Sequence, residues 1–381
     1  MFHVKHASPA QPSLFHVKQI APPGDNPVNF ALYFNSIPGR ARNQKTILNQ
    51  PARPPPIALT MGDPSGIGPE LCIKAVAHLQ RQGESTPLRL FGDLAHLLEI
   101  NALLGRPLDP RAVSEMTEDI GNLGPYPIGK VAANSGRAAY QSVKSAAQAC
   151  LSGEVAAMVT APLNKEAMRL AGHAWPGHTE LLAHLSQPEA PPPVRMLLVN
   201  HELKVLLHTI HIPLSRVASQ ITGPSLLETI QIAHHQGGRY GCPNPRIAVA
   251  GLNPHASEGG VIGREDIDVI APCIESARAL GIQVSGPWPA DTVFMRARQN
   301  PNEIQLVIAL YHDQGLIPIK YLGVDHGVNI TLGLPFVRTS VDHGTAFDIA
   351  QTWKASPDSL LAAIHEAEKM ASYAQANPLT D

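Results

Sequence analysis

Short apolar runs alternate with longer amphipathic stretches from residue 57 onward, and this alternation constrains the fold more than any other feature of the chain. The apolar runs have the length of buried strands, and the stretches between them, such as Asn134 to Leu151, carry apolar residues at helical spacing. The pattern is typical of α/β proteins, in which a mostly parallel sheet packs between helices. We therefore predict an α/β fold with strands at residues 57–60, 88–91, 155–160, 195–199, 204–210, 247–252 and 304–310.

The predicted helices lie between and after these strands, at residues 93–104, 134–151, 215–235, 266–280, 345–351 and 357–374. The loop G-D-P-S-G-I-G-P-E, residues 62–70, opens a further helix, because Pro69 suits a first helical turn. We find no repeat period that would indicate a solenoid or a propeller.

Length and composition exclude several classes of protein. The 381 residues suffice for two domains, and the net charge of −2 comes without a basic stripe, which argues against a nucleic-acid partner. The four cysteines form no C-x-x-C pair, which argues against zinc fingers and a disulfide framework. Because no apolar stretch reaches the roughly 18 residues of a membrane helix and no secretion signal is evident, we expect a cytoplasmic protein without a membrane partner.

The first 56 residues differ from the rest, being rich in Pro, Asn and Gln, with F-H-V-K occurring at Phe2 and again at Phe15. We predict that residues 1–56 are a disordered extension. A transit peptide and a start codon assigned too early both remain open for this segment.

Three histidines far apart in sequence each follow an apolar run in a short motif that we interpret as non-helical: His211 in T-I-H-I-P-L, His255 in G-L-N-P-H-A-S-E-G-G and His312 in Y-H-D-Q-G. They would lie at the carboxyl ends of strands, where open α/β sheets place their sites. Three imidazoles can hold a divalent metal ion. A single histidine in such a position is more often an ordinary polar residue, but Asp313, next to His312, could orient a ligand or act as an acid or base.

Two further segments have the residue types of an anion site. T-A-P-L-N-K, ending at Lys165, precedes G-H-T-E, in which His178 and Thr179 begin a helix whose free N–H groups attract anions, although Thr179 could merely cap that helix. Further along, Lys320, Asn329, Thr331 and Arg338 supply cations and polar groups beside segments that read as buried, which favours a pocket over open surface.

The loop at residues 62–70 is a weaker signal. Its glycines do not have the spacing of a dinucleotide fingerprint, so Gly62 marks either a structural turn or the edge of a cofactor site. Asp342 and His343 open the segment D-H-G-T-A and could help to place a cofactor.

Eight motifs in order resemble one known family: T-M-G-D-P-S-G-I-G-P-E, T-A-P-L-N-K-E, G-H-T-E, H-I-P-L, G-L-N-P-H-A-x-E-G-G, P-A-D-T-x-F, Y-H-D-Q-G-L-I-P-x-K and G-V-N-I-T-L-G-L-P-F-x-R-T-S-V-D-H-G-T-A. Together they strongly resemble the PdxA family of 4-hydroxythreonine-4-phosphate dehydrogenases of vitamin B6 synthesis. The resemblance runs from Ile57 to the carboxyl end. The sequence departs from the pattern at Asp325 and His326, so the loop before Asn329 is expected to differ.

The resemblance implies a homodimer with the isocitrate/isopropylmalate dehydrogenase-like fold, built from two α/β/α domains with a cleft between them. We expect the first domain at residues 57–172 plus 327–381 and the second at 173–326. The resemblance also implies one divalent metal ion per active site, shared across the subunit interface. The matching positions are His211, His255 and His312 for the metal, His178, Thr179, Lys320, Asn329 and Arg338 for the substrate, and Asp291 and Asp313 near the metal.

The implied reaction is the NAD- or NADP-dependent oxidation of 4-phosphooxy-L-threonine, followed by loss of CO₂ from the keto acid. The sequence leaves open the base, among Asp291, Asp313 and Lys320, and the preferred nicotinamide cofactor. Imidazole ligands favour zinc, cobalt or manganese over magnesium, and the resemblance allows each of them. The rival functions are a dehydrogenase of 4-phosphothreonate or 4-phosphoerythronate, a metal-dependent phosphatase, and a non-catalytic metal-binding module.

Overall fold

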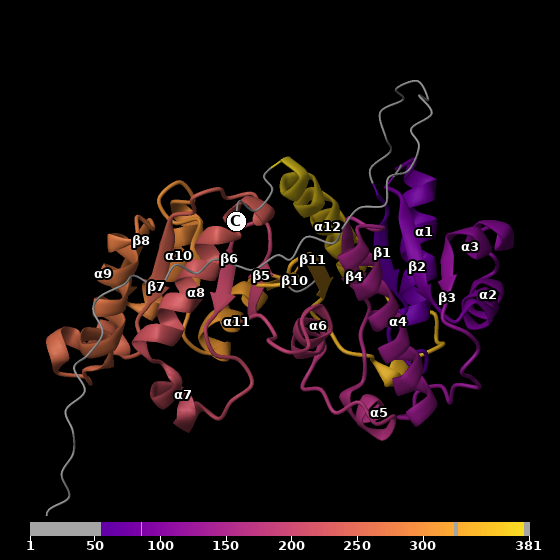
Figure 1. Cartoon of the computed structure of the whole chain (residues 1–381), viewed down its shortest axis with the longest axis horizontal. Coiled ribbons are helices and arrows are strands. Elements are labelled where there is room, and N and C mark those ends of the chain that lie inside the picture. Colours follow the sequence, from indigo (N-terminus) through magenta and orange to yellow (C-terminus); the bar gives the residue numbers. More distant parts are fainter. Residues whose placement is uncertain (1–54, 85, 324–326, 377–381) are drawn as a thin grey trace, which may run out of the picture. The chain divides into compact units, whose positions relative to one another are not determined.

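The computed structural model describes residues 55–84, 86–323 and 327–376 (Figure 1). The predicted extension lies outside the described residues except for residues 55 and 56, and so does the departure at Asp325 and His326. Within the described part of the chain, no helix is both long enough and apolar enough to cross a membrane.

Eleven strands of the described residues form one sheet in the order β3-β2-β1-β4-β11-β10-β5-β6-β9-β7-β8. The seven predicted strands are all present, several of them shorter than expected. The strands are β1 (Ile57–Thr60), β2 (Leu88–Gly92), β3 (Thr117–Asp119), β4 (Ala157–Thr160), β5 (Arg195–Val199), β6 (Lys204–Leu207), β7 (Ile247–Ala250), β8 (Val284–Trp288), β9 (Leu306–Ala309), β10 (Val328–Leu332) and β11 (Val337–Val341).

Helices connect most of these strands. They are α1 (Gly68–Gln82), α2 (Leu94–Leu103), α3 (Pro110–Met116), α4 (Ala133–Ser152), α5 (Lys165–Leu170), α6 (His178–Ser186), α7 (Leu214–Gln220), α8 (Gly223–His235), α9 (Ala271–Ala279), α10 (Ala290–Gln299), α11 (His312–Tyr321) and α12 (Asp358–Ala376). Short helical turns lie at Gly237–Tyr240, Pro254–Gly260, Asp266–Ile270 and Phe347–Ile349.

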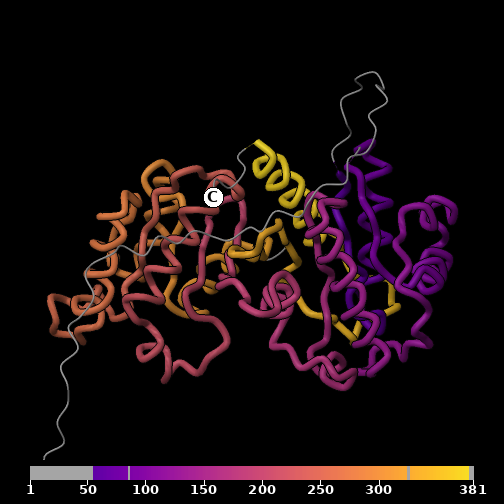
Figure 2. The backbone as a smooth tube through the Cα atoms, viewed as in Figure 1, coloured from indigo at the N-terminus to yellow at the C-terminus, as the bar shows by residue number. Residues whose placement is uncertain are grey.

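The sheet is parallel toward both edges and antiparallel in the middle. Strands β1 to β4 and β11 pair in parallel, as do β6, β9, β7 and β8, whereas β10 and β5 make antiparallel pairs between the two sets. Figure 2 shows the late strands β10 and β11 running between segments from much earlier in the chain. The predicted α/β class is therefore confirmed, and the division into two domains stays a prediction.

Side chains alternate between the two faces of each strand, and this alternation gives the fold its layers of helices on either side of the sheet. In β1, Ile57 and Leu59 point to one face and pack with Leu71 of α1, whereas Ala58 points to the other face and packs with Val143 of α4. Successive side chains of a strand lie on opposite faces, so a strand of apolar residues buries both of its faces. Helices therefore cover both faces of the sheet, as the uninterrupted apolar runs predicted.

Four local expectations need correction. The helix predicted at residues 345–351 is only a short 3₁₀ turn, Phe347–Ile349. The helix predicted at residues 215–235 is two helices, because Thr222 caps a new helix that starts with Gly223 and Pro224. The helix predicted from Asp266 starts with a wide π turn before α9. His312 does not lie in a non-helical motif but is the first residue of α11, where its ring lies at the helix start.

Candidate active site

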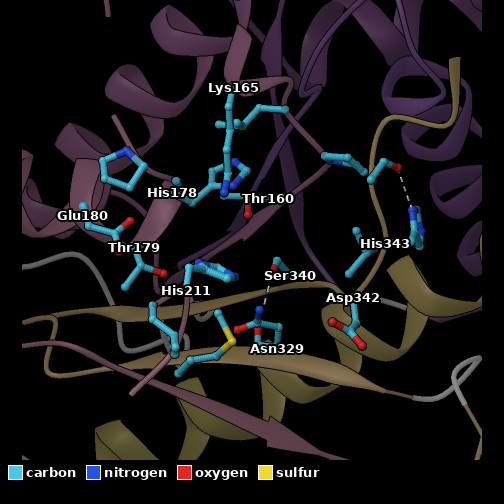
Figure 3. Close-up of a pocket in the computed structure, with 18 of the residues that line it drawn as sticks. Thr160, Lys165, His178, Thr179, Glu180, His211, Asn329, Ser340, Asp342 and His343 are labelled. Carbon is cyan, nitrogen blue, oxygen red and sulfur yellow. Dashed lines mark hydrogen bonds between the residues drawn. The ribbon is translucent and has the colours of Figure 1, made fainter. Parts of the chain in front are cut away.

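A cavity of about 400 Å³ lies where β10, β11 and β5 meet the start of α6 and helix α11 (Figure 3). The antiparallel middle of the sheet supplies its floor, because the register sets Asn329 opposite Ser340 and so places both side chains on one face. The predicted site residues that line the cavity are His178, Thr179, His211, His312, Lys320, Asn329, Arg338, Asp342 and His343.

Arg338 is a buried cation of this cavity, with only 3% of its surface exposed. Its Nη1 donates to Thr331 Oγ1 at 3.0 Å and its Nη2 donates to Thr160 Oγ1 at 2.7 Å, while its Nε has no hydrogen-bond partner among the residues that the structure describes. Burial lowers the pKa of Arg338 to about 9, and the nearby Glu180 works in the opposite direction. A buried guanidinium with a free N–H is suited to bind an anion.

His178 is the first residue of α6 and is directed into the same space. Burial, and then the cations Arg338 and Lys165, hold the pKa of His178 well below its usual value, so the ring is neutral. Its Nε2 and the Oδ1 of Asn329 are buried without a hydrogen-bond partner in the described structure. Buried polar atoms are rarely left unpaired, so these atoms indicate a polar ligand.

Two lysines line the cavity, and they differ in their surroundings. Lys320 forms an ion pair with Asp342, with 3.0 Å between Nζ and Oδ2. Lys165 starts α5 behind its cap Asn164 and has no carboxylate partner among the described residues. No role was predicted for Lys165 from the sequence, although the motif T-A-P-L-N-K that ends with it was an available signal.

His211 and His312 lie together, with their ring centroids 5.6 Å apart. Burial first, and then Lys165 and His312, lower the pKa of His211, which favours the neutral ring that can act as a metal ligand. His312 Nδ1 donates to Asp313 Oδ1 at 2.7 Å, which leaves Nε2 with its lone pair. Metal-binding histidines are commonly oriented by a carboxylate in this way, so the two rings fit a divalent ion.

The third predicted ligand, His255, lies elsewhere. Its side chain is 62% exposed and lines neither cavity in which His211 and His312 are found, and its Nδ1 donates to Glu258 Oε2 at 2.6 Å. Across the described residues, no three His, Cys, Asp or Glu side chains of one chain are grouped to hold a metal ion. One chain therefore brings together two of the three predicted ligands.

The two predicted acids are also separated. Asp313 lies beside His211 and His312 in a second, smaller cavity. Asp291 is an exposed residue of the first turn of α10, a helix that packs against the turn carrying His255. Asp313 thus lies with the histidine pair, and Asp291 with the separate histidine.

The predicted cofactor residues come from two segments that touch. Gly62 has a φ of 69°, and a Cβ there would lie 2.3 Å from the carbonyl oxygen of Pro162, so glycine is required. In the same loop, Ile67 N donates to the carbonyl oxygen of Thr345, two residues after His343. The structure therefore joins the loop at residues 62–68 to the segment after Asp342, although Gly62 itself does not line the main cavity.

The 62–68 loop also holds a buried acid that the sequence analysis missed. Asp63 is fully buried, its Oδ1 accepts from Ser65 N at 2.9 Å, and its Oδ2 has no partner in the described structure. Burial raises the pKa of Asp63 to about 6, against the lowering effect of the Ser65 hydrogen bond.

Known proteins resemble this chain over most of its length. The 4-hydroxythreonine-4-phosphate dehydrogenase of Beijerinckia indica is 44% identical over 327 residues, covering 83% of this chain and 95% of that protein. The D-threonate 4-phosphate dehydrogenase of Salmonella typhimurium is 44% identical over 329 residues, covering 83% of this chain and 98% of that protein.

The fold agrees with the sequence comparison. The crystal structure of 4-hydroxythreonine-4-phosphate dehydrogenase from Klebsiella pneumoniae superposes with a TM-score of 0.73 at 44% identity, covering 83% of this chain and 99% of that one. The family model described as "Pyridoxal phosphate biosynthetic protein PdxA" matches residues 88–367. The match covers more than half of the sequence, and we conclude that this chain belongs to the PdxA family.

Proposed function

We propose that this chain oxidises the C3 hydroxyl of 4-phosphooxy-L-threonine (4-hydroxythreonine 4-phosphate), passing hydride to NAD⁺ or NADP⁺ and releasing a proton. The product, 2-amino-3-oxo-4-phosphooxybutanoate, then loses CO₂ to give 3-amino-2-oxopropyl phosphate on the route to pyridoxal phosphate. The observation that carries the proposal is the set of unpartnered buried atoms of His178, Asn329 and Arg338 in one cavity with the His211 and His312 rings.

The anionic groups of the substrate are bound by cations and donors that surround the cavity. Arg338 offers Nε, Lys320 offers an ammonium group that Asp342 stabilises, and the N-terminal end of α6 offers backbone N–H groups near Thr179. Because Arg338 is also held by Thr160 and Thr331, its position requires little rearrangement when an anion binds.

His211 and His312 of one subunit would hold a divalent metal ion, and His255 of a second copy would supply the third imidazole. When bound, the ion would supply Lewis acidity that makes the substrate hydroxyl more acidic and would stabilise enolate charge. Asp313 fixes His312 with Nε2 free. Three imidazole ligands favour zinc, cobalt or manganese. Because the third imidazole comes from a second copy, a homodimer is part of the proposal.

Among the ionisable groups, Lys165 is the best placed to accept the hydroxyl proton. Lys320 is paired with Asp342 and Asp313 is engaged with His312, so neither side chain is free to approach the substrate hydroxyl. Lys165 lines the cavity beside His178 and His211 without a carboxylate partner among the described side chains. Its Nζ, in the neutral amine form that has a free lone pair, is the atom to which we assign the proton.

The loop at residues 62–68 contacts the segment that follows Asp342 and His343. We propose that the nicotinamide cofactor binds where these two segments meet. Gly62 allows the close backbone approach, and Asp342 and His343 line the cavity next to the substrate groups. Titrating the full-length protein with NAD⁺ and with NADP⁺ measures this contact directly. A His343→Ala variant is expected to weaken cofactor binding.

The test is a spectrophotometric assay at 340 nm with both cofactors and three substrates. These are 4-phosphooxy-L-threonine, 4-phosphothreonate in its D form (D-threonate 4-phosphate) and 4-phosphoerythronate. We expect NADH or NADPH formation with 4-phosphooxy-L-threonine, lost with a chelator and restored by zinc, cobalt or manganese. Greater turnover of another substrate would assign the chain to that one instead, and release of inorganic phosphate without cofactor reduction would make it a phosphatase.

Mixed dimers test whether the metal site is shared. His211→Ala and His255→Ala variants, each inactive alone, recover activity after co-refolding if the ligands come from two chains, because one site of each mixed dimer is then intact. About a quarter of wild-type activity is expected from random pairing in a twofold dimer. Without recovery, and with mixed dimers detected by mass, sharing of the site is refuted.

A further inference from the structure

The turn that carries His255 has an unusual backbone. Five consecutive residues, 255–259, have positive φ angles of 54°, 52°, 73°, 43° and 65°, and the first four of them are not glycine. This left-handed conformation is unfavourable for residues with a Cβ atom, and it persists only where the surroundings impose it. Something outside the turn must therefore hold it.

The carboxylate of Asp266 is the group that holds it. Asp266 is fully buried and accepts hydrogen bonds from the backbone N–H groups of Leu252, at 2.7 Å, and Asn253, at 3.0 Å. It also accepts from Ser257 Oγ at 2.8 Å, from inside the turn, and from Asn253 Nδ2 at 3.2 Å. One carboxylate thus links the residues that precede the turn, 252 and 253, to Ser257 at its centre.

Ser257 is buried within the turn, but two of the other side chains at left-handed positions do not offset the strain by burial. His255 and Glu258 are exposed, with 62% and 56% of their side-chain surfaces accessible, and they bond to each other through Nδ1 and Oε2. Glycines would form the same turn with less strain. The arrangement of His255 with Glu258 repeats that of His312 with Asp313, in which a carboxylate takes Nδ1–H and leaves Nε2 free.

We infer that Asp266 is a positioning residue for the active site of a second copy: it locks the left-handed turn so that His255 presents its free Nε2 outward, toward an ion held by the His211 and His312 of that copy. This inference rests on the proposed function, because it takes His255 as the third ligand. In the described structure the Asp266 carboxylate is bonded to Leu252, Asn253 and Ser257, so it would act on the site only through the turn.

The experiment compares Asp266→Asn with Asp268→Asn in the full-length protein. Asn has one acceptor oxygen in place of two, so the turn loses part of its support, whereas Asp268 pairs with Arg264 on the surface and, in the described part of the chain, makes no side-chain hydrogen bond to the turn. We measure zinc affinity by competition with a chromophoric chelator, and hydrogen exchange of the amides at residues 252–260. We expect Asp266→Asn to weaken zinc binding 10- to 100-fold and to speed exchange in the turn, with Asp268→Asn like wild type.

A milder variant keeps the test decisive if Asp266→Asn fails to fold. Ser257→Ala removes one donor to Asp266 and the acceptor for Asn253 Nδ2, and leaves the other hydrogen bonds of Asp266. It is therefore expected to shift zinc affinity and exchange in the same direction by a smaller factor. If Asp266→Asn does not fold, Ser257→Ala decides the question by the same two measurements.

The outcomes separate this inference from the function on which it rests. If His255→Ala binds zinc as tightly as wild type, His255 is not a ligand and the proposed metal site fails. If His255→Ala loses zinc but Asp266→Asn and Ser257→Ala keep full affinity while exchange in the turn rises, the positioning role alone is overturned.

Discussion

His312 Nδ1 and Asp313 Oδ1 are joined by a hydrogen bond of 2.7 Å, although the two residues are neighbours in sequence at the start of helix α11. The contact fixes which imidazole nitrogen carries the proton and which is free. Because Asp313 is exposed and makes this bond at the surface of the second cavity, its carboxylate can be removed without opening a core.

The first prediction concerns this pair. Asp313→Ala leaves His312 free to rotate and to change tautomer, so zinc affinity should fall 10- to 100-fold while the unfolding temperature stays close to that of wild type. Isothermal titration of the metal-free protein with zinc measures the effect. An unchanged dissociation constant would show that the carboxylate does not orient the ring.

The second prediction concerns Lys165. Lys165→Met removes the proposed proton acceptor and should lower kcat by about 100-fold or more, with a smaller effect on KM. Lys165→Arg keeps the charge but not the basicity, so it should remain slow. If Arg restores kcat, Lys165 acts only as a binding cation, and the pH profile of the two variants distinguishes these roles.

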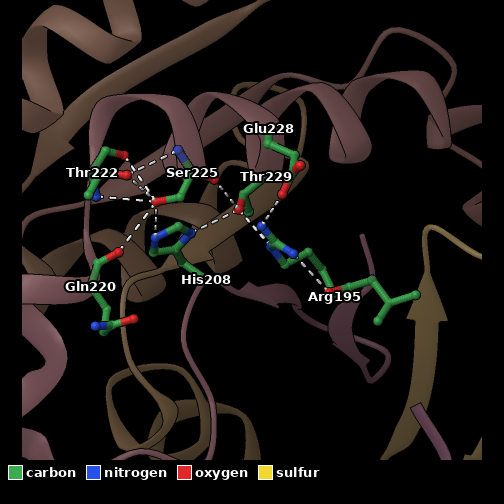
Figure 4. A network of polar contacts seen from close by, with 8 residues as sticks. Arg195, His208, Gln220, Thr222, Ser225, Glu228 and Thr229 are labelled. Atoms are coloured by element: carbon green, nitrogen blue, oxygen red, sulfur yellow. Dashed lines mark hydrogen bonds and ion pairs between the residues drawn. The ribbon is translucent and has the colours of Figure 1, made fainter. Parts of the chain in front are cut away.

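The third prediction concerns stability at low pH. His208 lies in a polar network with Thr229, Ser225 and Arg195 (Figure 4), where Nδ1 bonds Thr229 Oγ1 at 2.8 Å. Burial, and then the charge of Arg195, lower the pKa of His208 to about 4 from the ordinary value of 6.5. The unfolded chain therefore binds more protons than the folded chain between these two values, and the free energy of unfolding falls as pH is lowered through that range.

The loss from His208 is at most about 3 kcal/mol between pH 6.5 and 4. Urea unfolding at a series of pH values measures it, and His208→Gln serves as the control because glutamine does not titrate. The free energy of unfolding is plotted against pH for both proteins, and the difference between the two slopes gives the contribution of His208 apart from the other titrating groups. Equal slopes would mean that His208 is not buried as a neutral ring.

The fourth prediction concerns the close approach of α11 to the sheet. A Cβ at Gly315 would lie 2.5 Å from Leu207 Cδ2 and 2.9 Å from Ala309 Cβ. Gly315→Ala should therefore push α11 outward, lowering the free energy of unfolding by about 1–3 kcal/mol. It should also raise KM, because α11 carries His312 and Lys320.

The matched control is Gly223→Ala in the first turn of α8, where a Cβ would meet no atom within 4 Å. This variant should unfold at the same denaturant concentration as wild type and keep its KM. Similar losses in both variants would mean that the crowding beneath α11 is not what makes Gly315 sensitive.

Local sequence patterns determined the class of the fold. Apolar runs of strand length, interrupted by segments of helical period, identified seven strands that are all present, because burial on two faces demands apolar residues at every strand position. Gly and Pro marked the loops, but Gly223 and Pro224, which begin a second helix, were read as part of one longer helix. A short interruption is hard to recognise where the apolar spacing continues on both sides of it.

Residue types and motifs also identified most of the candidate site: nine of the predicted residues line one cavity. Which of them touch was decided only by the tertiary structure. Arg338 bonds Thr160 from 178 positions away because β11 and β4 are parallel neighbours, and no local pattern encodes that pairing. The same holds for the antiparallel middle of the sheet that forms the floor of the cavity.

The sequence by itself thus determined which chemical groups the chain carries and which segments become strands and helices, since both depend on neighbouring residues. The tertiary structure decided that His255 lies apart from His211 and His312. It also decided the hydrogen bonds that Asp266 accepts and left Lys165 without a carboxylate partner among the described residues. These relationships depend on how segments far apart in the chain pack together, and that packing is settled by the balance of burial and hydrogen bonding over the whole fold.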